Sequence, residues 1–98
     1  MTTTTALSIT TAARVLADVV DAGRDAGLPA PSNLHTMTYA AHSLSVRDFG
    51  DVEAWAAWLG VATSRYLGRD GTVEFCEAVA EREGVTFKVA TNRKVVRA

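Results

Sequence analysis

A short apolar segment that holds both tryptophans, Asp51 to Gly60, constrains the fold of this chain most. Asp51 is a good N-cap, because its carboxylate can accept hydrogen bonds from the free amides of a first helical turn. Gly60 stands where a helix often ends in the left-handed conformation. At about 100° per residue, one face of this helix collects Val52, Trp55, Ala56 and Leu59. The segment therefore predicts a helix that packs this face into a core, with Trp58 at its border.

The composition favours one small domain. The 98 residues are 48% hydrophobic and 21% charged with a net charge of −1, which is typical of a single soluble globular domain spanning residues 1–98. The longest apolar run, residues 54–62, is shorter than the roughly 20 residues of a membrane-spanning helix. Residues 1–7 lack the features of a secretory signal, so we expect a flexible tail and a cytoplasmic location. The single cysteine, Cys76, permits no intrachain disulfide.

Residues 8–27 have the periodicity of an amphipathic helix. Its apolar side consists of Ile9, Ala12, Ala13, Leu16, Val19, Val20 and Ala26, and its polar side of Arg14, Asp18, Asp21 and Asp25. Ser8 or Thr10 is placed to cap this helix, and Gly27 to end it. The two prolines within residues 28–32 restrict the residues before them to extended conformations, so they predict a connector.

Residues 34–39 and 42–47 alternate like two strands of a hairpin around Ala40 and Ala41. If Tyr39 lies opposite His42, the apolar face pairs Met37 with Leu44 and His35 with Val46, and the hydroxyl face pairs Thr36 with Ser45 and Thr38 with Ser43. One apolar face and one hydroxyl face predict a one-sided antiparallel sheet.

The second half of the chain predicts further strands. Residues 61–67 indicate a strand, residues 68–71 a tight turn, and residues 85–91 a strand with Val85, Phe87 and Val89 on one side. Residues 72–82 fit two patterns. A helix would group Val73, Phe75, Cys76, Val79 and Ala80, whereas a strand would place Val73, Phe75 and Val79 on one face with Glu77 among them. The periodicity favours the helix.

The chain also resembles a group of small α+β proteins of actinobacteria and their phages, which implies a phage origin. The resemblance covers about residues 28–91. It rests on the Leu28-Pro-x-Pro connector, the following hairpin, Asp51-Val-Glu-Ala-Trp-Ala-Ala-Trp-Leu-Gly-Val61 and Glu77-Ala-Val-Ala-Glu-Arg-Glu-Gly-Val-Thr-Phe-Lys-Val89. In that group the region like residues 77–89 is a hairpin that turns at Gly84, which favours strands there. No activity is attached to the group, so the resemblance implies no function.

The residues that could supply chemistry form no recognisable motif. His35, His42 and Cys76 are the only soft metal ligands, and the histidines lie at opposite ends of the predicted hairpin face. Cys76 stands among alanine and valine, without the flanking signature of a catalytic cysteine. The carboxylates form rows on predicted solvent-exposed faces instead of converging in a cleft. We therefore expect no enzyme, no metal and no cofactor.

These patterns predict an α+β fold, with two helices packed on one face of an antiparallel sheet of four or five strands, in the order helix, hairpin, helix, strands. For the function we expect a non-enzymatic binding or regulatory module. It would act through a protein partner or through self-association, without a membrane. Trp58, flanked by Ala54 and Ala57, is the candidate contact, because tryptophan is enriched among the residues that dominate interfaces.

The alternative function is weak nucleic-acid binding by the C-terminal segment. No acidic residue follows Glu83, and the basic residues there could neutralise phosphates. The candidate contacts are Lys88, Arg93, Lys94 and Arg97. Single-strand binding also calls for aromatic stacking residues beside the basic ones, and the predicted hairpin offers serine and threonine instead. Protein contact is therefore the first expectation.

Overall fold

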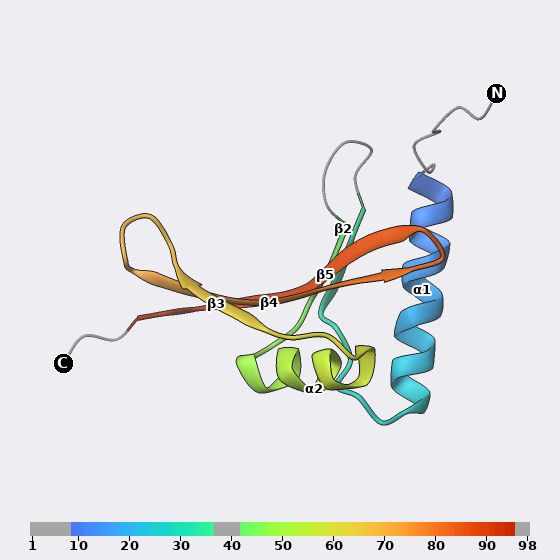
Figure 1. The fold of residues 1–98 in the computed structure, drawn as a ribbon, viewed down its shortest axis with the longest axis horizontal. Helices are drawn as coiled ribbons and strands as arrows, with labels where there is room; N and C mark the ends of the chain where they lie inside the picture. The colour runs from blue at the N-terminus through green and yellow to red at the C-terminus, as the bar shows by residue number, and fades with distance from the viewer. Residues whose placement is uncertain (1–8, 37–41, 96–98) are drawn as a thin grey trace.

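The computed structural model describes residues 9–36 and 42–95 and has an α+β fold with a five-stranded sheet (Figure 1). The elements are α1 (Ile9–Asp25), β1 (Asn33–His35), β2 (His42–Ser45), α2 (Phe49–Leu59), β3 (Ser64–Leu67), β4 (Val73–Arg82) and β5 (Val85–Lys94). The strand order is β1-β2-β5-β4-β3. No helix in the described ranges is long and apolar enough to cross a membrane.

The sheet is mixed, which corrects the prediction of a purely antiparallel one. β2 and β5 run parallel, and the other three neighbouring pairs run antiparallel. The parallel pair arises because the chain leaves β2 through α2 and two further strands, and then returns to β2 in the same direction. Parallel neighbours need such a long crossover, whereas consecutive strands can form hairpins.

The β4–β5 hairpin forms the centre of the sheet. Its ladder runs from the pair Val73–Lys94 to the pair Arg82–Val85. The two turn residues, Glu83 and Gly84, have φ values of 51° and 80°. A type I′ turn requires positive φ at both positions, and its twist matches that of the strands. The hairpin at Gly84 is therefore confirmed, and the helix that periodicity favoured for residues 72–82 is wrong.

The side chains that β2, β4 and β5 turn toward the helices form the core. This helix face consists of Leu44, Cys76, Ala78, Ala80, Val85, Phe87 and Val89, all of which are buried. α2 packs against β4 and β5, and its Trp55 is completely buried. The indole of Trp55 donates its Nε1–H to the carbonyl of Pro29 at 2.9 Å. The predicted inward face of this helix is confirmed.

α1 stands at the end of the molecule where β4 turns into β5 (Figure 1). There its Ala12 and Val15 form a small buried cluster with Val85, while Leu16 and Val19 join the Trp55 core. The two helices thus share one core, as predicted, but only α2 packs along the middle of the sheet. Ile9 and Ala26 are exposed, contrary to the prediction, because they lie at the two ends of α1.

α2 begins earlier than predicted. Asp48 is its N-cap, and the Asp48 carboxylate accepts a hydrogen bond from the backbone N–H of Asp51 at 2.9 Å. Asp51 therefore lies inside the first turn instead of capping it. Gly60, with φ of 76°, ends the helix as predicted. β3 begins only at Ser64, because the chain at Val61 folds back and its N–H bonds the carbonyl of Ala56 at 3.0 Å.

The first hairpin has a different register from the predicted one. β1 pairs Leu34 with Leu44 and His35 with Ser43, whereas the prediction paired His35 with Val46. The offset of three residues is odd, so it reverses the facing of β1. His35 consequently lies on the serine side, and Leu34 joins Leu44. The predicted turn, together with Met37 and Tyr39, lies outside the described residues.

Candidate functional site

The sheet has a second face, opposite the helix face, which we call the open face. Its central and β3-side members, by register, are Ser43, Ser45, Ser64, Tyr66, Val73, Phe75, Glu77, Val79, Glu81, Thr86, Lys88, Ala90, Asn92 and Lys94. None of these side chains is buried, whereas the apolar helix-face side chains of the same central strands are all buried. The part of the chain that the structure describes therefore leaves this face uncovered.

β4 is apolar on both of its faces. Cys76, Ala78 and Ala80 point into the core, and Val73, Phe75 and Val79 point outward on the open face. Val79, at the centre, is 54% exposed. A strand with one face in water normally alternates apolar and polar residues, and near-continuous apolar strands are typical of sheets covered on both faces. The outer row of β4 lies between these two patterns, because it is apolar at Val73, Phe75 and Val79 and charged at Glu77 and Glu81.

Two aromatic rings stand together on the open face. Tyr66 of β3 lies directly opposite Phe75 of β4, and their rings stack with centroids 5.1 Å apart and planes 17° apart. The Tyr66 hydroxyl donates to the Glu77 carboxylate at 3.2 Å. Partial burial and the negative charge of Glu77 raise the pKa of Tyr66. The phenol therefore stays a neutral hydrogen-bond donor well above physiological pH.

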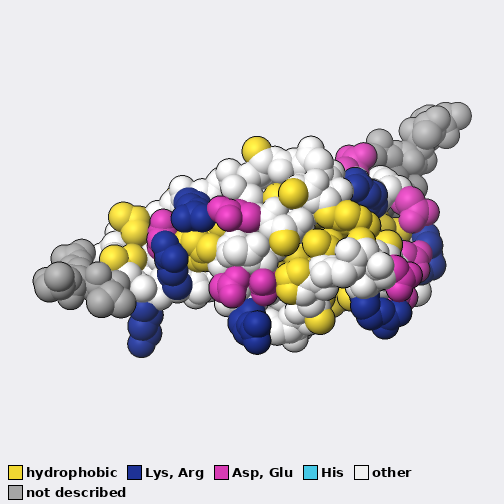
Figure 2. Space-filling view, turned by 90° about the horizontal axis from the view of Figure 1, so that it is seen from below, with side chains coloured by type: hydrophobic (Ala, Val, Ile, Leu, Met, Phe, Trp, Pro, Cys, Tyr) yellow, Lys and Arg dark blue, Asp and Glu magenta, His cyan; other side chains and the backbone are white. Residues whose placement is uncertain are grey.

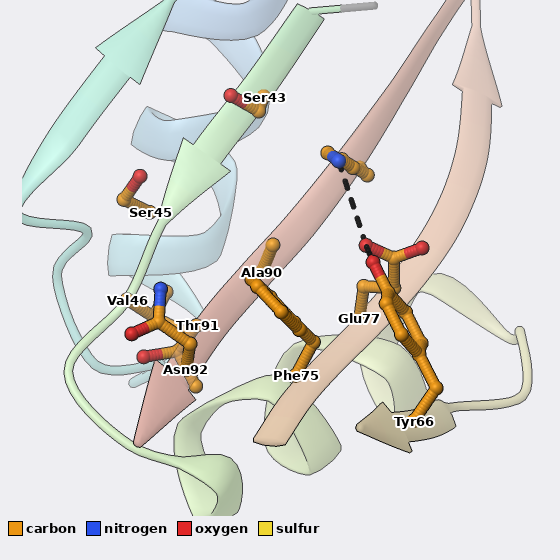
Figure 3. A pocket seen from close by; sticks show the side chains of 10 residues that line it. Ser43, Ser45, Val46, Tyr66, Phe75, Glu77, Ala90, Thr91 and Asn92 are labelled. Atoms are coloured by element: carbon orange, nitrogen blue, oxygen red, sulfur yellow. Dashed lines mark hydrogen bonds and ion pairs between the residues drawn. The ribbon is translucent and has the colours of Figure 1, made fainter. Parts of the chain in front are cut away.

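A hollow of about 410 Å³ runs across the open face beside these rings (Figure 3). Its lining residues are Ser43, Ser45, Val46, Tyr66, Phe75, Glu77, Lys88, Ala90, Thr91 and Asn92. Ala90 has the smallest apolar side chain among them and leaves space between the serines of β2 and the rings of Tyr66 and Phe75. Lys88 and Glu77 form an ion pair at 3.5 Å within the hollow. The lining thus offers apolar surface together with donors and acceptors, and its charges cancel.

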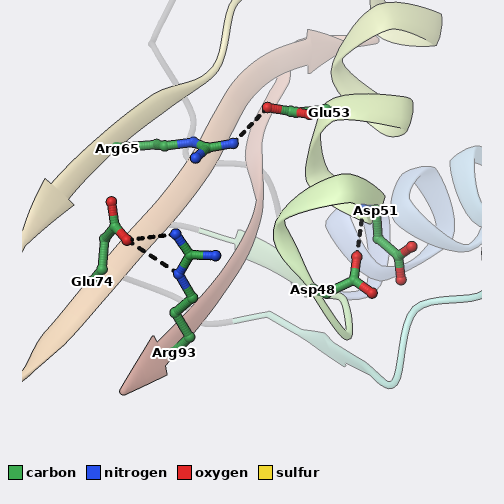
Figure 4. Close-up of polar contacts among 6 residues, drawn as sticks. All are labelled: Asp48, Asp51, Glu53, Arg65, Glu74 and Arg93. Atoms are coloured by element: carbon green, nitrogen blue, oxygen red, sulfur yellow. Dashed lines mark hydrogen bonds and ion pairs between the residues drawn. The ribbon is translucent and has the colours of Figure 1, made fainter. Parts of the chain in front are cut away.

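The predicted nucleic-acid contacts do not form one patch. Lys88 and Lys94 lie on the open face, and Arg93 points to the other side of the sheet. Arg97 lies outside the described residues. Lys88 is paired with Glu77, and the Arg93 guanidinium bonds Glu74 through two nitrogens, at 2.9 and 3.1 Å (Figure 4). Adjacent positions in a strand face opposite sides, so a run of basic residues there divides its charge between two surfaces.

Arg93 and Arg65 serve the packing of α2 against the sheet. Their guanidinium carbons lie 4.0 and 4.9 Å from the ring centroid of Phe49, within cation–π distance. Arg65 also bonds Glu53 of α2 at 2.7 Å, and this hydrogen bond raises the pKa of Arg65. Figure 2 views the molecule from the α2 side and shows basic and acidic side chains next to each other. That side has no extended surface of one charge.

On the predicted interface of α2, Trp58 is less exposed than Tyr66 and Val79 on the open face. Trp58 is 37% exposed, and its ring stands edge-on to that of Trp55 at a centroid distance of 5.7 Å. Ala57 is exposed and Ala54 is half-buried. Part of the Trp58 surface is therefore used within the chain, and a contact through Trp58 stays a prediction.

The described residues offer no cluster of metal ligands. Among residues 9–36 and 42–95, no three histidine, cysteine, aspartate or glutamate side chains converge on a point that could hold a metal ion. Cys76 is buried on the helix face, where burial raises the pKa of its thiol. A raised pKa disfavours the thiolate, which is the nucleophilic form of cysteine.

The open face was not among the predicted sites, although the sequence carries a signal for it. With a two-residue turn at Glu83 and Gly84, Phe87 lies opposite Ala80, and Val89 opposite Ala78. This register assigns Val73, Phe75 and Val79 to the side away from the core.

Comparison of the chain with protein-family models, with curated proteins and with solved structures found no match. The open face is therefore interpreted from its own chemistry.

Proposed function

We propose that this chain is a non-enzymatic protein-binding module and that the open face is its contact surface. The observation that supports this proposal best is the apolar outer row of β4, Val73, Phe75 and Val79. Exposed apolar surface rimmed by polar side chains is typical of protein interaction sites. Here the rim combines the charged Glu81 and Lys94 with serine, threonine and asparagine side chains, which can hydrogen-bond a partner without the desolvation cost of a charge.

The composition of the open face favours a protein over a nucleic acid. Its central charged pair, Glu77 and Lys88, is neutral as a unit, and phosphate binding depends on uncompensated positive charge. Tyr66 and Phe75 do offer an aromatic surface beside Lys94, which is the combination that single-strand binding uses. Glu77 and Glu81 on the same face repel phosphates and disfavour this alternative.

The proposal can be tested with one substitution on the open face and one matched control. Val79→Glu places a carboxylate at the centre of the open face, opposite Lys88. Ala57→Glu adds the same charge at an exposed position of α2. Each purified protein is first compared with the parent chain by thermal unfolding. The three are then immobilised, a lysate of the source cells is passed over them, and captured proteins are quantified by mass spectrometry.

We expect a captured protein that the parent chain and Ala57→Glu retain and that Val79→Glu loses at least tenfold. When that protein is purified and titrated against the three chains, Val79→Glu must again bind it at least tenfold more weakly than the parent chain and Ala57→Glu do. A second titration uses single-stranded DNA at 20–50 mM salt, where screening is weakest. Binding to DNA without any Val79-dependent protein contact would replace the proposal with the nucleic-acid alternative.

A further inference from the structure

We infer that the partner of the open face is a second copy of this chain, an inference that rests on the proposed function. In the arrangement we infer, the two open faces pack against each other about a two-fold axis that lies between the sheets and runs perpendicular to the strands. Such an axis places β4 over β4 and β5 over β5 with their directions reversed. A two-fold contact uses the same patch on both copies, so the open face must be complementary to itself.

The charges at the two ends of the open face are complementary to themselves about this two-fold axis. Lys94 lies beside Val73 at one end, and Glu81 lies beside Thr86 at the other. Neither side chain forms an ion pair within the described residues, in contrast to Glu77 with Lys88. Reversing the strands brings Lys94 of each copy to the end where Glu81 of the other copy lies. Two identical ion pairs then form across the axis.

Two of the three residues in the apolar row of β4, Phe75 and Val79, meet the same requirement, whereas Val73 lies over Glu81 of the other copy. About an axis centred on the pair Glu77–Ala90, Phe75 of one copy lies over Val79 of the other, and this contact occurs twice. Ala90 lies over Ala90, where two small side chains allow the sheets to approach. Glu77 likewise lies over Glu77, and each carboxylate stays bonded to Lys88 and Tyr66 of its own copy, which neutralises its charge at the centre.

The size of the open face suits a dimer of modest affinity. β1 to β5 have 3, 4, 4, 10 and 10 residues, which at about 3.3 Å per residue and about 4.8 Å per strand give a surface of up to roughly 500 Å² per copy. Two copies would bury up to about 1,000 Å², which is in the range of weak, transient protein contacts. Aligned packed sheets cross at about 30°, and the long side chains of Lys94 and Glu81 can span the resulting offset. The small net charge of −1 gives little repulsion between copies.

Charge reversal tests this arrangement directly. Sedimentation equilibrium is measured between about 2 and 200 μM for the parent chain, Glu81→Lys, Lys94→Glu and the double variant. Asp25→Lys, an exposed reversal on α1, is the matched control. We expect the parent chain to reach twice its 10.4 kDa mass at the upper concentrations. Each single reversal puts like charges together at two places per dimer, so its Kd should rise tenfold or more.

The double variant should restore the dimer to within about threefold of the parent Kd, because its reversed charges again meet opposite ones. Restoration requires Glu81 and Lys94 to meet across copies, since within one copy they lie at opposite ends of the open face. A parent chain that stays monomeric at 200 μM would overturn the inference. So would single reversals that behave like Asp25→Lys, or a double variant as weak as either single one. In any of those cases a Val79-dependent partner from the capture experiment would still support the proposed function.

Discussion

The two faces of β4 differ in side-chain size as well as in burial. Toward the helices β4 presents small residues, Cys76, Ala78 and Ala80, and toward the open face it presents larger ones, including Phe75 and Val79. The small set leaves room for α2 and its Trp55 to approach the sheet. In the large set Phe75 stacks on Tyr66, and Val79 is left 54% exposed. Burial of apolar side chains on the helix face therefore stabilises the chain, whereas apolar area on the open face remains available for association.

The largest effect is expected from removing the main side chain of the helix face. Trp55→Ala deletes a fully buried ring and its hydrogen bond to Pro29, so the free energy of unfolding should fall by about 3–5 kcal/mol. Tyr66→Ala, the matched truncation on the open face, should cost only about 1–2 kcal/mol, since half of that ring is already in water. Urea titrations measure both. Equal losses of unfolding free energy in the two variants would contradict the distinction between the helix face and the open face.

A methyl group added beneath Trp55 should have the next largest effect. A Cβ on Gly23 of α1 would overlap the ring atoms of Trp55, so Gly23→Ala should destabilise the chain by up to about 3 kcal/mol. Gly50→Ala in α2 is the control, because the added methyl would meet only the Asp48 carboxylate, at 3.4 Å. There alanine should be neutral or slightly stabilising. If both variants have the same melting temperature, α1 does not pack against Trp55.

A further prediction concerns Trp58 of α2, which contributes either to association or to the stability of the fold. If it marks a contact, Trp58→Ala should weaken association by about 2 kcal/mol or more while the melting temperature of the monomer hardly changes. A variant that unfolds readily and associates as before would show that Trp58 only supports Trp55. Sedimentation and thermal unfolding of the same samples separate the two results.

The smallest effect is expected at the edge of the open face. Tyr66→Phe removes the hydrogen bond to Glu77, and we expect a loss below about 1 kcal/mol. The folded-state pKa of Tyr66 is raised above its ordinary value of about 10. The stability linked to this phenol is therefore present below pH 10 and is lost as the pH rises through the folded pKa. Urea midpoints at pH 8 and 11 should show a smaller decline for Tyr66→Phe, and an equal decline would contradict this assignment.

Local patterns sufficed for the helices and for the inward face of α2, because burial of Trp55 follows directly from helical spacing. They failed for residues 72–82. Val73, Phe75, Cys76, Val79 and Ala80 make one apolar face as a helix and two as a strand, and the strand forms because the turn at Gly84 aligns it with β5. The parallel pairing of β2 with β5 could not be predicted, since it joins segments more than 40 residues apart. The open face depends on both of these features.

The central claim, that the open face is covered in solution, has a direct test in thiol labelling. Cys76 is buried, so a thiol introduced by Val79→Cys would be the accessible one on the open face. Its rate of reaction with a maleimide is measured at about 1 and 200 μM protein, with Ala57→Cys as the control on α2. The account predicts that the Val79→Cys thiol reacts at least several-fold more slowly at 200 μM, whereas the control keeps one rate. Concentration-independent rates for both thiols would contradict it.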